Sequence, residues 1–77
     1  MDTIQRGQRS KELLDDPIIV EALTKIEDTI RQTWEDTTST EHREELWYTL
    51  KGCLRFKEYL TIAVQNGEFE LTKRDNP

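Results

Sequence analysis

The sequence predicts an all-α protein, an antiparallel two-helix hairpin with a short N-terminal helical turn that dimerises into a helical bundle. Asp16 followed by Pro17 is a typical helix start. No apolar residue falls between Glu35 and Glu45, so a polar joint separates two apolar blocks. The only alternating apolar segment, residues 69–71, is too short to pair as a strand. These observations favour two helices joined by a turn.

The N-terminal residues are predicted to contribute little to the core. Residues 1–9 are rich in Gln, Arg and Gly and have little to bury, so we expect a flexible segment. Ser10 can cap a short helical turn over residues 11–15, which presents Leu13 and Leu14 to the hairpin.

The first long helix is predicted over residues 17–36. Asp16 is a preferred N-cap residue, and Pro17 suits the first helical position because its missing N–H has no partner there. The residues that follow repeat at spacings of four and three, which is the pattern of a helix seam. This seam consists of Ile19, Leu23, Ile26, Ile30 and Thr33.

The second helix is predicted over residues 39–66. Thr38 can form a capping box with Glu41, and Ser39 or Thr40 could cap the helix equally well. One side of the helix carries a seam for the first helix, made of Leu46, Leu50, Cys53, Leu60 and Val64. Lys57 falls inside that seam, so its stem escapes to solvent or its ammonium pairs with an acid of the first helix.

The C-terminal end is predicted from one glycine. Gly67 can supply the left-handed residue that ends a helix. After it, Phe69 and Leu71 could fold back onto the helix. Residues 10–71 are therefore expected to form one helical domain, and 72–77 a flexible tail.

The second helix is apolar on more sides than one partner helix can cover. At about 100° per residue, its outer side carries Tyr48, Gly52, Phe56 and Tyr59. The two tyrosines could simply lie on neighbouring side chains with their hydroxyls in water. The alternative is a protein-interaction surface, at which Gly52 permits close approach of a second chain. We take these four residues as the candidate interaction site.

Composition and charge narrow the function classes. The 77-residue chain has a net charge of −5, and residues 12–45 carry eleven acidic and three basic side chains. A nucleic-acid partner is not expected, because phosphate-backbone binders concentrate basic groups on one face. The sequence has no run of about 20 apolar residues that could span a membrane and no signal-peptide core, so we expect a soluble intracellular protein.

Chemical motifs are sparse. His42 with Glu45 would share a helical face, but two such groups do not make a metal site. Cys53, the only cysteine, falls on the seam with no histidine near it in sequence, so a packed thiol is expected rather than a nucleophile. We therefore expect no enzymatic activity, no catalytic residue, no metal and no cofactor.

Several short segments carry a resemblance to known proteins. They are Leu13-Leu14-Asp15-Asp16-Pro17, Trp34, Arg43-Glu44-Glu45-Leu46-Trp47, Leu50-Lys51 and Asn66-Gly67. With these segments the chain resembles a group of small bacteriophage and prophage proteins that look like helical hairpins. The resemblance covers residues 12–68 and rests on packing and capping residues, so it carries over no catalytic residue.

The expected function follows from the interaction surface and this resemblance. We expect a non-enzymatic phage module for protein–protein interaction, self-associating or binding a phage or host protein, in virion or head assembly. One alternative is an accessory inhibitor that binds a host protein, and another is a small nucleic-acid-binding regulator. The expected location is the host cytoplasm or the virion.

Overall fold

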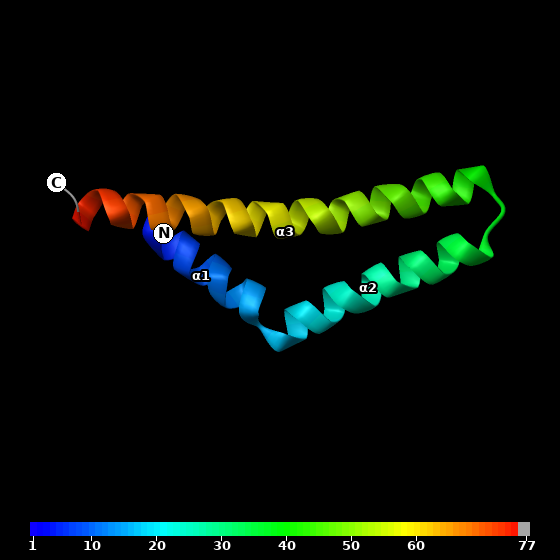
Figure 1. The fold of residues 1–77 in the computed structure, drawn as a ribbon, viewed down its shortest axis with the longest axis horizontal. Helices are drawn as coiled ribbons and strands as arrows, with labels where there is room; N and C mark the ends of the chain where they lie inside the picture. Colours follow the sequence, from blue (N-terminus) through cyan, green and yellow to red (C-terminus); the bar gives the residue numbers. More distant parts are fainter. Residues whose placement is uncertain (76–77) are drawn as a thin grey trace.

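Residues 1–75 form three helices rather than the two of a simple hairpin. The computed structural model describes residues 1–75, with α1 (Thr3–Asp15), α2 (Pro17–Asp36) and α3 (Thr40–Asp75). Both α1 and α2 run antiparallel to α3 and follow each other along one side of it (Figure 1). The described residues contain no strand. The all-α prediction is confirmed, but the first arm of the hairpin consists of two helices.

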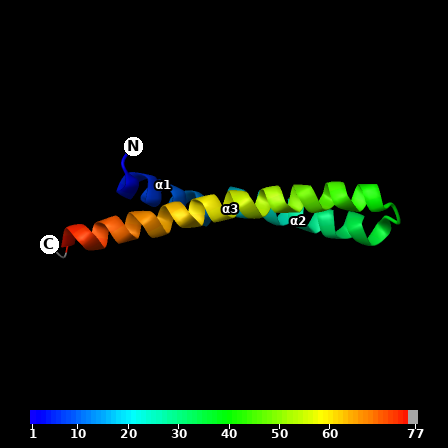
Figure 2. The ribbon, with the colours of Figure 1, turned by 90° about the horizontal axis from the view of Figure 1, so that it is seen from above.

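The molecule is elongated. Its extents are 58 × 23 × 18 Å and its radius of gyration is 16.8 Å, whereas a compact domain of this length has a radius of about 11 to 12 Å. Viewed from above, α3 lies over α1 and α2 and crosses them at a shallow angle (Figure 2). No further helix covers the side of α3 that faces away from α1 and α2 among residues 1–75 (Figure 1).

Helix α1 occupies a segment that the sequence was expected to leave flexible. Its start is fixed by a capping box, because Asp2 Oδ1 accepts from the Gln5 N–H at 2.8 Å and Gln5 Oε1 accepts from the Asp2 N–H at 3.2 Å. Residues 1–9 were predicted to be flexible because they hold few large apolar side chains. The fully buried residues of α1 are small ones, Gly7 and Ser10. Ser10 is not a cap: it lies inside α1 and is 4% exposed.

Two glycines bring α1 and α3 into backbone contact. A Cβ built on Gly7 would lie 2.8 Å from the carbonyl oxygen of Ala63 and 3.0 Å from the Cα of Gly67. A Cβ on Gly67 would lie 3.1 Å from the carbonyl oxygen of Thr3. Real Cβ atoms almost never approach backbone as closely as the 2.8 Å at Gly7, so a side chain there would force the helices to shift. A Cβ on Gly67 would require the α1 backbone to move by a few tenths of an ångström.

The junction between α1 and α2 follows the prediction. The Asp16 carboxylate accepts from the N–H groups of Ile18 at 2.8 Å and Ile19 at 3.4 Å, and Pro17 occupies the first turn. Asp16 itself has an extended conformation, with φ −67° and ψ 122°, so α1 and α2 cannot be one continuous helix. The predicted bounds of α2 are confirmed.

Helix α3 is capped by Ser39, one of the three residues that the sequence offered as its cap. It starts at Thr40, and the Ser39 Oγ accepts from the His42 N–H at 3.3 Å. The Thr37 Oγ1 accepts from the Ser39 N–H at 3.3 Å and orders the joint. Ser39 therefore has the capping role that was left open between it, Thr38 and Thr40.

The predicted end of α3 is wrong. The helix continues through Gly67 to Asp75, and no glycine among the described residues has a positive φ. Packing of α1 against Gly67 supplies tertiary contacts that outweigh the weak helix propensity of glycine. Phe69 and Leu71 do not fold back but are exposed on α3. The predicted tail 72–77 is helical up to Asp75, and residues 76–77 lie outside the described part of the chain.

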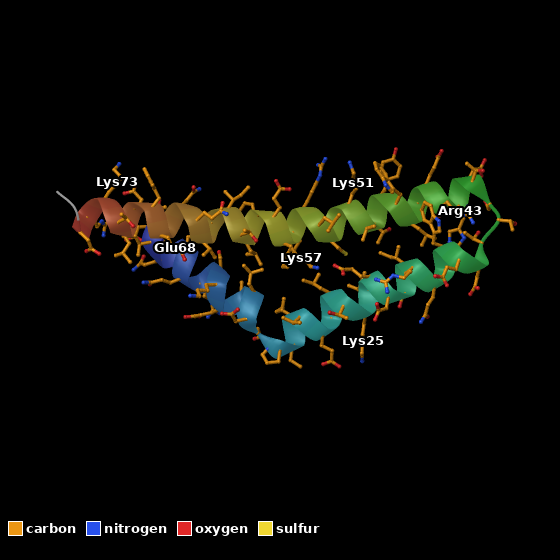
Figure 3. All side chains as sticks on the ribbon, viewed as in Figure 1. Lys25, Arg43, Lys51, Lys57, Glu68 and Lys73 are labelled. Atoms are coloured by element: carbon orange, nitrogen blue, oxygen red, sulfur yellow. The ribbon has the colours of Figure 1, made fainter. Side chains whose placement is uncertain are left out.

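The predicted seam of α3 is buried, but not all of it faces α2. The five predicted α3 residues are buried or half-buried, and on α2 only Ile26 departs, at 41% exposure. Val64 lies beside Ile4 and Gly7 of α1 instead. Lys57 points toward α2 and forms an ion pair with Glu27 (Figure 3). Of the two alternatives for its ammonium group, pairing with an acid of α2 is therefore the one observed.

Candidate protein-interaction surface

Most of the large apolar side chains do not reach a core. Among residues 1–75, three hydrophobic residues are buried, Ile30, Leu60 and Ala63, whereas thirteen large hydrophobic side chains are exposed. Isolated exposed apolar groups are normal, but here they outnumber the core.

The solvent-accessible surface of the chain is larger than that of a compact monomer of the same mass. The chain exposes 6143 Å², whereas a compact monomer of 9.2 kDa exposes about 4,900 Å². The difference of about 1,200 Å² arises because α1 and α2 cover only one side of α3 (Figure 1). A standard protein–protein interface buries about 800 Å² per partner, so the excess is large enough for one interface.

The four predicted site residues are all exposed. Tyr48 is 67%, Phe56 46% and Tyr59 66% exposed, and Gly52 is also exposed. The structure does not gather them into one patch. Gly52 and Phe56 border a groove between α2 and α3, Tyr59 borders a pocket beside α1, and Tyr48 lies near the joint between α2 and α3. Their role in binding stays a prediction.

The groove between α2 and α3, called the α2–α3 groove below, is the most apolar of these places. Its residues are Ile19, Ala22 and Leu23 from α2 and Thr49, Gly52, Cys53 and Phe56 from α3. Gly52 leaves a depression in it, because a Cβ built there would meet no atom within 4 Å. Phe56 follows one helical turn later, so a depression and an exposed ring lie next to each other.

The Tyr59 pocket is more polar. Thr3 and Arg6 of α1 line one side, and Tyr59, Ile62 and Asn66 of α3 line the other, together with the buried Ala63. The pocket exists because α1 reaches this part of α3. Because residues 1–9 were predicted to be flexible, this pocket between α1 and α3 could not be predicted from the sequence.

A cluster at the closed end of the hairpin was also missed. The Arg43 guanidinium lies 5.5 Å from the centroid of the Trp34 ring, and the Lys51 ammonium lies 4.3 Å from that of Trp47. The rings of Trp47 and Tyr48 meet edge to face at 5.6 Å. Trp, Tyr and Arg are the residue types enriched at binding hot spots. The i,i+4 spacing of Trp47 and Lys51 was the sequence signal for half of this cluster.

The basic side chains of α3 are mostly engaged within the chain. Lys57 pairs with Glu27, and Lys51 lies over the Trp47 ring. Lys51 points away from α2 while Lys57 points toward it (Figure 3), so the two do not share a face. Arg55 forms no ion pair with another residue of the described range 1–75.

Residues 1–75 contain one histidine, His42, and one cysteine, Cys53, as candidate chemical groups. That range holds no group of three His, Cys, Asp or Glu side chains that could bind a metal ion. The His42 Nδ1 lies 3.4 Å from the Thr37 Oγ1, and Cys53 is a half-buried free thiol in the α2–α3 groove. None of the three helices is long and apolar enough over residues 1–75 to cross a membrane.

Comparison with protein-family models, with curated proteins and with solved structures finds no match to this chain. The resemblance to small phage proteins therefore stays a prediction.

Proposed function

We propose that this chain is a non-enzymatic module for protein–protein interaction, which binds through the α2–α3 groove and the adjoining outer side of α3. The observation that carries this proposal is the excess of about 1,200 Å² of surface over that of a compact monomer of 9.2 kDa. Thirteen large apolar side chains of residues 1–75 lie in water, and a chain of this size has only a small core to offset that loss of stability. A protein partner that covers this surface would restore the lost stability.

The proposed setting is a bacteriophage, with virion or head assembly as the role. This part of the proposal rests on the resemblance over residues 12–68. An inhibitor of a host protein uses the same groove and differs only in its target, so one experiment can separate the two roles.

Photo-cross-linking in infected cells tests the proposal. Phe56 is replaced by a benzophenone-bearing phenylalanine analogue, and Thr72, exposed on α3 outside the groove, is replaced in the control. We expect discrete adducts from position 56 and none from position 72. Adducts within purified particles support assembly, and adducts with a host protein support inhibition. A chain that forms no adduct at position 56, with itself or with another protein, contradicts the proposal.

A nucleic-acid partner is the third candidate, and the charge arrangement disfavours it. Lys51 and Lys57 are engaged with Trp47 and Glu27, respectively, which leaves Arg55 alone between residues 51 and 57. We expect no binding to duplex or single-stranded DNA at low salt. Binding that weakens steeply as salt rises would favour the regulator instead.

A further inference from the structure

The three glycines of this chain lie in different surroundings. Gly7 and Gly67 meet at the crossing of α1 and α3, where a Cβ on either would lie about 3 Å from backbone atoms of the other helix. Gly52 lies in the middle of α3 with nothing within 4 Å of its Cβ position. A glycine inside a helix costs about 0.5 to 1 kcal/mol relative to alanine. The fold of one chain offers no contact that offsets this cost at Gly52.

We propose that the open position at Gly52 receives the Phe56 ring of a second copy of this chain, whose α3 packs antiparallel across the α2–α3 groove. This inference rests on the proposed function and names its partner. Without a Cβ at Gly52, a ring of the second chain can lie directly on the α3 backbone there.

The groove is complementary to itself in that arrangement. Phe56 lies one turn after Gly52 on the same side of α3, and its ring is 46% exposed. A two-fold axis between antiparallel helices places Phe56 of each copy over Gly52 of the other, since in such an interface residue i meets j and j meets i. Parallel helices would instead place ring against ring and leave both depressions empty.

The area also fits a second copy. Burying the excess of about 1,200 Å² on each of two identical chains gives an interface in the range of obligate homodimers. Ile19 and Ala22 of α2 border the same groove, so the contact would include both long helices. The product is a four-helix bundle of two α2 and two α3 helices.

Gly52→Ala tests the proposal because its two expected effects have opposite signs. At concentrations at which the chain is monomeric, alanine should raise the folding equilibrium constant about two- to fivefold, through helix propensity alone. In sedimentation equilibrium it should weaken dimerisation about tenfold or more, because the added methyl overpacks the position that receives the ring. Thr61→Ala is the matched control, on the other side of α3. It should leave the dimerisation constant unchanged.

Two results would overturn the inference. If Gly52→Ala dimerises as tightly as the wild type, the ring of the second copy does not lie at Gly52. If the wild type remains monomeric at high micromolar concentration, the partner is not a second copy. In that case adducts of position 56 with a different protein would still support the proposed function, so the two failures are distinguishable.

Discussion

Gly7 of α1 and Gly67 of α3 meet backbone to backbone where the two helices cross: a Cβ on Gly7 would lie 3.0 Å from the Cα of Gly67. This contact joins the two ends of the chain, because α1 lies beside the C-terminal part of α3 (Figure 1). Gly7 and Ser10 are the buried residues of α1, whereas Ile4, Leu13 and Leu14 are half-buried. The position of α1 therefore depends on backbone proximity at Gly7 together with the partial burial of these three apolar side chains.

Gly67→Ala should release α1 from α3. The new methyl would have to displace backbone of α1, at an expected cost of about 1 to 3 kcal/mol that exceeds the gain in helix propensity. Amide hydrogen exchange measures the effect, and we expect faster exchange in α1 than in the wild type. The same substitution at Gly52 should not change exchange in α1. Unchanged protection of α1 in Gly67→Ala would show that the crossing is not close.

The Lys57–Glu27 pair should couple α2 to α3. Both side chains are partly buried, at 39% and 26% exposure, which strengthens their attraction relative to a surface pair. A double-mutant cycle with Lys57→Met and Glu27→Gln should give a coupling of about 1 kcal/mol in urea denaturation. The exposed pair Lys25–Glu21, with N···O at 3.2 Å, is the control and should give a few tenths. Equal coupling in the two cycles would rule out a special role for Lys57.

Asp16→Ala should destabilise the junction between α1 and α2. The Asp16 carboxylate accepts from two N–H groups at the start of α2, and loss of an N-cap costs about 1 kcal/mol. Asp16→Asn keeps the acceptor oxygen and should recover most of the loss. Urea denaturation of the three proteins is the measurement. An alanine variant as stable as the wild type would mean that Pro17 alone sets the start of α2.

The parts of the fold that sequence could predict are those with local causes. Asp16 and Pro17 start α2 by chemistry within one turn, and the seam of α2 and α3 follows from periodicity. For Lys57 in the seam, pairing with an acid of the first helix was one of two alternatives that the sequence left open. These features need no knowledge of distant contacts.

What sequence missed depends on contacts between distant segments. Gly67 reads as a helix end by itself, and only the approach of Gly7, sixty residues earlier in the chain, makes it a packing position within α3. The contact of Arg43 with Trp34 likewise requires the register across the joint. The helical wheel predicted the exposure of the four site residues, but the α2 residues beside Gly52 and Phe56 could not be assigned without that register.

Tyr59→Glu should weaken self-association. Tyr59 is 66% exposed on α3, and in the antiparallel arrangement it meets the other copy near that copy's residue 49. A carboxylate at this position must lose its hydration when the second copy covers it, a cost that the tyrosine ring does not have. We expect a dimerisation constant weakened about tenfold or more and an unchanged monomer fold by circular dichroism, because Tyr59 lies outside the seam. A dimer as tight as that of the wild type would remove Tyr59 from the interface.

Sedimentation equilibrium of the wild-type chain across the micromolar range shows whether a second chain covers the apolar surface that α1, α2 and α3 leave open. We predict an average mass that rises with concentration from one chain toward two. A mass that stays at that of one chain at high micromolar concentration would contradict this prediction.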